Sequence, residues 1–246
     1  HDIEADYREF AGEVGLTDVT CIPISALRGD NIIEPSSNTP WYHGPTLLGH
    51  LEAIEIDDEA QHAPLRMPVQ WVNRPNLDFR GFSGQLAAGT VRPGDRLRVL
   101  PSGQESTVAR VVTSDGDLDR GVAGQSVTLC LTDEIDVSRG DVLVAADDPA
   151  GIADQFQCHL VWMAEEELLP GRPYLLKLGT RTVTATVSAP KYQVNVNTLE
   201  HTAARTLGLN AIGVCNISVD RQVPFDPYES NRDMGGFILI DRFTNA

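Results

Sequence analysis

Apolar residues recur at two different spacings along this chain, and the change of spacing marks its organisation. Near the start, Ile3, Tyr7, Phe10 and Val14 follow one another at intervals of four, three and four positions, which places them on one face of a helix. From Leu65 onward, short apolar runs are separated by turns rich in glycine and aspartate. Such a pattern is typical of antiparallel barrels. The pattern therefore predicts α/β structure at the start of the chain and β structure afterwards.

The first region is predicted to contain a helix, a strand and a second helix. Asp2 can cap the first helix, and residues 19–24 form an apolar run of strand length. Pro45 suits the first position of the second helix, whose buried side would carry Leu47, Leu48, Leu51 and Ile54. A lone strand cannot satisfy its backbone polar groups, so we expect this region to be the end of a larger α/β domain. The acidic stretch 55–64 then marks the first domain boundary.

Residues 79–100 predict a small, tightly bent barrel. Four glycines, at positions 81, 84, 89 and 94, separate short apolar runs. Pro93-Gly94 fits the centre of a type II turn, and residues 96–99 alternate between polar and apolar, as expected of a strand with one buried face. Further strands of this unit are expected at residues 67–72, 107–112, 127–131 and 139–143.

A second β-rich unit is expected after the turn at residues 147–151. Its predicted strands cover residues 156–163, 174–178, 182–192, 212–219 and 237–241. Hydrophobic residues alternate within two of these runs, which indicates one buried face on each. The expected domains are therefore residues 1–64, 65–152 and 153–246, the last two being consecutive barrels.

The charge distribution argues against a protein that binds nucleic acid in bulk. The net charge is -16, and residues 1–64 hold 13 acidic side chains but only two arginines. Nothing resembles the basic stripe that phosphate neutralisation requires. No apolar run approaches the ~20 residues of a membrane span, and the start of the chain has no signal-peptide pattern. We therefore expect a cytoplasmic protein without a membrane partner.

Several familiar catalytic and metal-binding patterns are incomplete. Gly84 and Gly89 have the spacing of a phosphate-binding loop, but Thr90-Val91 stands where Lys-Ser/Thr is required. The four cysteines contain no C-x-x-C pair, and the six histidines contain no pair at helical ligand spacing. We therefore predict no catalytic residue and no metal ligand in this sequence.

Ser25-Ala26-Leu27 is the one candidate binding segment. It follows the predicted strand 19–24, and α/β proteins place ligand-binding groups where a strand opens into a polar loop. A backbone N–H in such a loop can donate to a carbonyl of a base, and a small side chain lets a flat ring approach closely. Three residues alone identify no ligand, so the segment needs support from the rest of the chain.

Two groups of residues supply that support. Residues 84–95, Gly-Gln-Leu-Ala-Ala-Gly-Thr-Val-Arg-Pro-Gly-Asp, resemble the second domain of translation-factor-type GTPases, and Ser25-Ala26-Leu27 is similar to the loop that contacts guanine in that class. Longer blocks are similar to the large, GTPase subunit of bacterial sulfate adenylyltransferase, also called ATP sulfurylase. These blocks are residues 25–31, 41–48, 171–181, 192–199 and 225–241. Together they span nearly the whole chain.

The resemblance implies both a fold and an activity. The fold would be two consecutive small antiparallel barrels preceded by the α/β C-terminal remnant of a P-loop GTPase domain. In that family, GTP hydrolysis drives the transfer of an adenylyl group from ATP to sulfate, which gives adenosine 5′-phosphosulfate and pyrophosphate for sulfate assimilation and cysteine biosynthesis. The transfer itself belongs to a small catalytic subunit, which is the expected partner, and GTP with Mg²⁺ is the expected cofactor.

The sequence also departs from the family. It contains no G-x-x-x-x-G-K-S/T, no D-x-x-G and no N-K-x-D, so the phosphate- and magnesium-binding parts of the family are absent from these 246 residues. We therefore expect a fragment that is inactive alone, and Ser25, Ala26 and Leu27 are the only nucleotide contacts that the resemblance assigns. An alternative is a translation elongation factor that binds tRNA or the ribosome. That role requires a basic face on the barrels, and the acidic balance favours the first interpretation.

Overall fold

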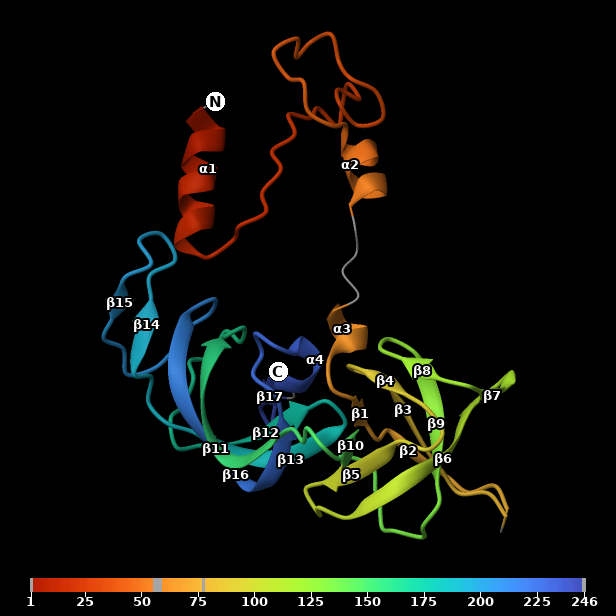
Figure 1. The fold of residues 1–246 in the computed structure, drawn as a ribbon. Coiled ribbons are helices and arrows are strands. Elements are labelled where there is room, and N and C mark those ends of the chain that lie inside the picture. Colours follow the sequence, from red (N-terminus) through yellow and green to blue (C-terminus); the bar gives the residue numbers. More distant parts are fainter. Residues whose placement is uncertain (1, 55–58, 77, 245–246) are drawn as a thin grey trace. The chain divides into compact units, whose positions relative to one another are not determined.

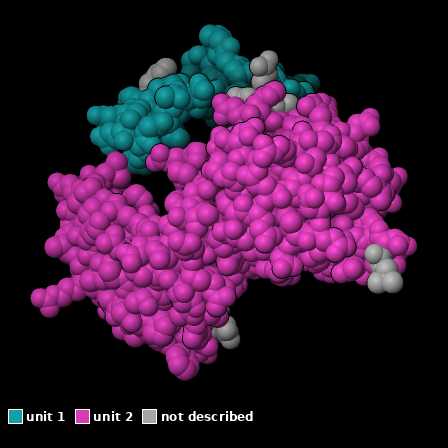
Figure 2. Space-filling model, turned by 60° about the horizontal axis from the view of Figure 1, so that its bottom comes forward, with its two compact units in different colours: residues 1–57 teal, residues 58–246 magenta. Residues whose placement is uncertain are grey.

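The computed structural model describes residues 2–54, 59–76 and 78–244. Residues 1–57 and 58–246 form two compact units, here called unit 1 and unit 2 (Figure 2). Strands β1 to β17 and the short helices α3 (Glu59–His62) and α4 (Arg232–Gly235) belong to unit 2 (Figure 1). The prediction of a mainly β fold with antiparallel strands is confirmed, whereas the three expected domain limits stay a prediction. Among the described residues, no helix has the length and apolar character needed to cross a membrane.

Helix α1 (Asp2–Glu13) forms as the apolar spacing predicts, but it does not bury its apolar face. Ile3 is 86% exposed, and Tyr7, Phe10 and Val14 are 42–47% exposed. Among the described residues of this helix, Ala11 alone is buried. The spacing therefore predicts the helix and the shared face of its apolar residues correctly. It does not predict that this face stays exposed within the described chain.

The strand predicted at residues 19–24 does not form, and that prediction was wrong. The segment lies in irregular backbone, and pairing begins only with an isolated bridge between Ser25 and Asp30. Strands are stabilised by the hydrogen bonds of a neighbouring strand. The described part of unit 1 offers no such neighbour, so the apolar run remains unpaired.

Helix α2 (Leu47–Ala53) begins after Pro45 rather than at it. Thr46 is the N-cap, and its hydroxyl oxygen accepts a hydrogen bond from the backbone N–H of Gly49 at 3.1 Å. A threonine hydroxyl satisfies one of the free N–H groups of a first helical turn, which proline cannot do. The predicted buried side was wrong: Leu47 is only partly buried, and Leu48, Leu51 and Ile54 are 41–59% exposed.

Strands β1 to β10 form the first barrel of unit 2 (Figure 1). They are β1 Arg66–Pro68, β2 Trp71–Asn73, β3 Gly81–Gln85, β4 Thr90–Val91, β5 Arg96–Leu100, β6 Glu105–Thr113, β7 Gly116–Leu118, β8 Gly121–Val122, β9 Ser126–Leu131 and β10 Val142–Ala145. Their order is β1-β10-β5-β6-β9-β3-β2, with β7 paired to β6 and β4 paired to β8. Met67, Phe82 and Leu129 are at most 2% exposed and lie in one continuous apolar core.

The turn predicted at Pro93-Gly94 is present between β4 and β5. Gly94 has a φ of +96°, a left-handed value that glycine adopts without steric cost. The N–H of Asp95 donates to the carbonyl oxygen of Arg92 at 3.2 Å, and a carboxylate oxygen of Asp95 accepts from the N–H of Arg92 at 2.7 Å. Asp95 of the Gly-Asp pair therefore bonds to both the carbonyl oxygen and the N–H of Arg92, which closes the turn.

Gly84 is required for a different reason. A Cβ atom at this position would lie 2.4 Å from the carbonyl oxygen of Pro68, so a side chain here would force the end of β1 away from β3. In β5, Leu97 and Val99 are buried while Arg96 is exposed, which confirms the predicted alternation. The glycine pattern thus records a close approach between strands and a turn, rather than a phosphate site.

Helix α3 corrects the expectation of an aperiodic linker at residues 55–64, of which residues 55–58 lie outside the described chain. The remaining part contacts the first barrel. The N–H of Gly89 donates to the carbonyl oxygen of Ala60 at 2.6 Å, and the hydroxyl of Thr90 donates to the carbonyl oxygen of Gln61 at 3.1 Å. The segment that leads into the barrel is therefore hydrogen-bonded to it.

Strands β11 to β17 form the second barrel of unit 2 (Figure 1). They are β11 Gly151–Val161, β12 Pro173–Leu178, β13 Arg181–Val187, β14 Tyr192–Val194, β15 His201–Thr202, β16 Ile212–Phe225 and β17 Phe237–Ile240. Their order is β15-β14-β16-β13-β12-β17, and β11 pairs with β16. Tyr174, Leu176 and Ile217 are at most 2% exposed within its core.

One predicted strand of this barrel is in fact two. The run expected at residues 182–192 is interrupted, because β13 ends at Val187 and β14 begins at Tyr192. Pro190 lies in the gap, and proline has no N–H for a strand ladder. The short strands β7, β8 and β15 were not predicted, since two or three residues carry too little periodicity to be recognised.

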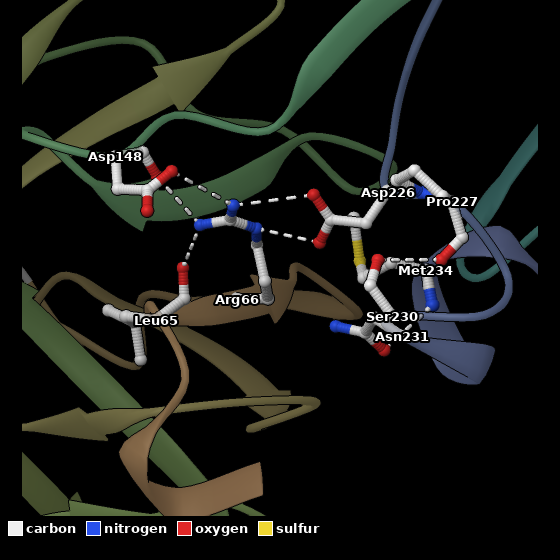
Figure 3. A network of polar contacts seen from close by, with 8 residues as sticks. All are labelled: Leu65, Arg66, Asp148, Asp226, Pro227, Ser230, Asn231 and Met234. Atoms are coloured by element: carbon white, nitrogen blue, oxygen red, sulfur yellow. Dashed lines mark hydrogen bonds and ion pairs between the residues drawn. The ribbon is translucent and has the colours of Figure 1, made fainter. Parts of the chain in front are cut away.

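The two barrels meet at the buried side chain of Arg66 (Figure 3). This side chain is 6% exposed, and its Nε lies 2.8 Å from a carboxylate oxygen of Asp226 in the second barrel. Its Nη1 donates to the carbonyl oxygens of Asp148 at 2.8 Å and Leu65 at 3.0 Å. A small apolar cluster joins the same two barrels: Leu100, Val142, Val144, Ala150 and Met234. The seam therefore combines a paired buried charge with apolar contact.

Candidate functional site

The predicted binding segment, Ser25-Ala26-Leu27, lies in a tight turn of unit 1. The N–H of Gly29 donates to the carbonyl oxygen of Ser25 at 2.7 Å, and the N–H of Arg28 donates to the same oxygen at 3.2 Å. The ends of the turn are joined by the N–H of Ser25, which donates to the carbonyl oxygen of Asp30 at 3.4 Å. The three predicted residues therefore lie in one hydrogen-bonded loop, which runs from Ser25 to Asp30.

This turn leaves backbone donors available. Ala26 and Leu27 are exposed, Leu27 at 95%, and their backbone N–H groups donate to no acceptor among the residues that the structure describes. The hydroxyl oxygen of Ser25 accepts from the N–H of Arg28 at 3.4 Å, so it is used inside the loop. Two free N–H groups beside a small side chain can bind a carbonyl oxygen on a flat ring.

The side chain of Asp30 links the loop to the segment that follows it. Its carboxylate accepts hydrogen bonds from the hydroxyl of Ser36 at 2.5 Å and from the side-chain amide of Asn38 at 2.9 Å. These two donors hold the pKa of the Asp30 carboxyl below its usual value, because they favour its charged form. The loop that carries the predicted site is thereby tied to residues 36–38.

Asn31 lies behind the loop and is 1% exposed. Its side-chain amide donates to the carbonyl oxygen of Pro23 at 2.7 Å and to the hydroxyl oxygen of Thr39 at 2.8 Å. Its side-chain oxygen accepts from the N–H of Ser36 at 2.8 Å. Sequence reasoning missed this residue, although an asparagine directly after Arg-Gly-Asp is a signal for a left-handed turn position.

The block at residues 41–48, which helped to carry the resemblance, forms the turn that precedes α2. The hydroxyl of Tyr42 donates to the carbonyl oxygen of Pro45 at 2.9 Å, and burial raises the pKa of this tyrosine above its usual value. A Cβ at Gly44 would lie 2.4 Å from the Tyr42 hydroxyl, so the ring covers this position. The block therefore has a local structural role beside the predicted loop.

The binding groups of this loop are backbone donors. Within the described ranges, no three His, Cys, Asp or Glu side chains are grouped closely enough to hold a metal ion. The phosphate-binding motifs named above are likewise absent from the sequence. The chemistry that this loop offers is recognition of a ligand through its backbone donors.

Three known proteins with different names are similar to this chain over nearly its whole length. Sulfate adenylyltransferase subunit 1 of Aeromonas hydrophila is 51% identical over 244 residues, which are 99% of this chain and 51% of that protein. The bifunctional enzyme CysN/CysC of Xylella fastidiosa is 53% identical over 99% of this chain and 39% of its own length. The bifunctional enzyme NodQ of Azospirillum brasilense is 52% identical with the same two coverages.

Over 99% of its length, this chain is therefore homologous to part of sulfate adenylyltransferase subunit 1. It spans about half or less of the length of these relatives. Residues 155–246 also match the family model described as GTP-eEF1A C-terminal domain-like. The predicted resemblance to translation-factor-type GTPases and to this subunit is confirmed.

Two solved structures are similar in fold to this chain. The crystal structure of Sup35 complexed with GDP has a TM-score of 0.72 at 21% identity, over 93% of this chain and 57% of that one. The translation elongation factor SelB from Methanococcus maripaludis, in its apo form, has a TM-score of 0.57 at 19% identity, over 73% of this chain and 40% of that one. At these identities the likeness shows the fold alone.

Proposed function

We propose that this chain is part of the GTPase subunit of a sulfate adenylyltransferase. In this role the whole polypeptide couples GTP hydrolysis to the formation of adenosine 5′-phosphosulfate and pyrophosphate from ATP and sulfate. The observation that carries the proposal is the 51% identity to a sulfate adenylyltransferase subunit 1 across 99% of this chain. The exposed, unpaired N–H groups of Ala26 and Leu27 support it, because they are the donors that a guanine carbonyl requires.

The proposed division of labour follows from the groups that this chain contains. Ser25, Ala26 and Leu27 contact the guanine of GTP, and the GTP phosphates with Mg²⁺ are bound by motifs that these 246 residues do not include. A small catalytic subunit performs the adenylyl transfer, so this chain supplies no catalytic residue. The complex works in the cytoplasm, where four free cysteines such as those of this chain stay reduced.

A translation-factor role is the second candidate. The match of residues 155–246 to the GTP-eEF1A C-terminal domain-like model favours it. The excess of 16 negative charges disfavours it, because binding to tRNA or the ribosome depends on neutralising phosphates. Salt-sensitive binding of tRNA at low ionic strength would support this second function, and its absence would remove it.

The test of the main proposal uses the full-length polypeptide together with the small catalytic subunit. Pyrophosphate release from ATP and sulfate is measured with GTP, with the non-hydrolysable analogue GMPPNP, and without guanine nucleotide. We expect release only while GTP is hydrolysed. Release at full rate without GTP, or with GMPPNP in its place, would contradict the proposed coupling.

A pair of matched variants tests the assigned loop in the same assay. Ala26→Leu places a branched side chain where a flat ring must approach, so the GTP concentration for half-maximal rate should rise about tenfold or more. Ala203→Leu makes the same change at an exposed alanine of the second barrel and should leave that concentration unchanged. Equal behaviour of the two variants would remove residues 25–27 from the guanine site.

A further inference from the structure

Asn31 combines three properties that are seldom found together in a surface loop. It is polar, it is 1% exposed, and its φ of +53° lies in the left-handed region. Asparagine tolerates that region better than most residues because its short side chain can bond locally. A buried polar side chain carries a free-energy cost unless it is hydrogen-bonded, so the partners of Asn31 show what it does.

These partners lie on both sides of the predicted guanine loop. The side-chain Nδ2 donates to Pro23, which precedes the loop, and to Thr39, which follows it, at 2.7 and 2.8 Å. The backbone carbonyl oxygen of Asn31 accepts from the N–H of Leu47, the first residue of α2, at 2.9 Å. One residue therefore holds the entry of the loop, the segment after it and the start of a helix.

The loop is shaped by its own backbone contacts at Ser25, and Asp30 and Asn31 tie it to the residues around it. Its own closure, from the N–H of Ser25 to the carbonyl oxygen of Asp30, measures 3.4 Å, which is long for a hydrogen bond. Ala26 and Leu27 are exposed and have no core contact to restrain them. The short contacts of Asn31 to Pro23 and Thr39 anchor the loop on both of its sides, and so they help to set where the free N–H groups of the loop lie.

We propose that Asn31 is a positioning residue that fixes residues 25–27 and thereby gives the loop its preference for a purine with a carbonyl at C6. The proposal rests on the proposed function, because it assumes that this loop contacts guanine. The chemistry is direct. An N–H donor held in place bonds to a carbonyl oxygen and meets a repelling N–H when an amino group replaces that oxygen.

The test compares two nucleotides on the full-length polypeptide. GDP carries the C6 carbonyl, and the diphosphate of 2,6-diaminopurine riboside carries an amino group there while keeping the same ring, sugar and phosphates. Asn31→Gly keeps the left-handed backbone and removes the side-chain amide. We expect its affinity for GDP to fall about tenfold and its affinity for the analogue to change less than about twofold, so that the ratio collapses.

Two further variants guard against a trivial result. Asn31→Asp keeps the acceptor for Ser36 but loses both donor contacts, and it should collapse the ratio in the same way. Asn210→Gly makes the same substitution at an exposed, left-handed asparagine of the second barrel, with a φ of +62°, and should leave both affinities unchanged. A parallel loss of both nucleotides in the Asn31 variants would mean that Asn31 only maintains the fold, and it would overturn the proposal.

Ala26→Leu separates this proposal from the one on which it rests. If Ala26→Leu weakens GDP binding and Asn31→Gly leaves the ratio unchanged, the guanine loop stands and the positioning role of Asn31 is overturned. If Ala26→Leu leaves GDP binding intact, the loop assignment itself fails, and the Asn31 proposal fails with it. A collapse of the ratio in both Asn31 variants, with Ala26→Leu impaired, supports both.

Discussion

Different kinds of interaction stabilise unit 1 and unit 2 internally. In unit 2, two continuous cores bury large side chains such as Phe82 and Tyr174 to 2% exposure. In unit 1, the apolar stripe of α1 stays exposed, and the buried centre of the loop region is the amide of Asn31. Burial of apolar area stabilises a fold without regard to direction, whereas hydrogen bonds fix atoms at set distances and angles.

This difference matches what the loop of unit 1 is proposed to do. A binding loop needs exposed donors at fixed positions, and such donors cannot be fixed by burying them. Unit 1 therefore uses short polar contacts behind an exposed loop, from Asp30 and Asn31 to residues 36–39. The barrels of unit 2 are instead stabilised by their apolar cores and by the Arg66 seam between them.

The largest expected effect comes from matched phenylalanine truncations in the two units. Phe82→Ala removes a ring that is 2% exposed in the first barrel and should lower the free energy of unfolding of unit 2 by about 3–5 kcal/mol. Phe10→Ala removes a ring of α1 that is 44% exposed and should change the free energy of unfolding of unit 1 by less than about 0.5 kcal/mol. Urea unfolding followed by far-UV circular dichroism measures both. Similar losses in the two variants would contradict the contrast between the units.

A smaller effect is expected at the seam. Arg66→Ala leaves the carboxylate of Asp226, itself 14% exposed, without its partner and should cost about 3 kcal/mol. Arg110→Ala breaks a surface pair with Asp117 in which both side chains are about half exposed, and it should cost less than about 1 kcal/mol. The same urea titration compares the two.

A double substitution identifies the reason for the loss at Arg66. Replacing Arg66 by Met and Asp226 by Leu removes both charges together, so it should recover much of the stability that Arg66→Ala loses. If the double variant is no more stable than the single one, the seam depends on the geometry of the ion pair rather than on avoiding an unpaired charge.

Much of unit 2 could be predicted from the sequence, because its strands have one face in a core and so alternate. Leu97 and Val99 in β5 show this directly, as do Cys215 and Ile217 in β16. The failures have physical causes. Residues 182–192 continued an apolar pattern across Pro190, and residues 19–24 had the composition of a strand but no neighbour to pair with. Local pattern predicts a strand's preference, while pairing decides whether it forms.

The candidate site could be predicted only in part. Ser25, Ala26 and Leu27 came from a resemblance, and the structure does bring them into one loop with free donors. The position of Asn31 after Arg-Gly-Asp signals a left-handed turn, but its contacts could not be predicted, because two of its partners lie eight residues away on either side and no periodicity connects them. Hydrogen bonds between irregular segments leave almost no trace in the order of polar and apolar residues.

Native-state hydrogen exchange of the chain tests the central claim most directly. If Asn31 fixes the loop, the N–H groups of Ser36 and Leu47, which donate to Asn31, should exchange slowly. The free N–H groups of Ala26 and Leu27 should exchange fast in the same sample. Exchange of Ser36 and Leu47 as fast as that of Ala26 and Leu27 would contradict the account, since the contacts behind the loop would then not hold it.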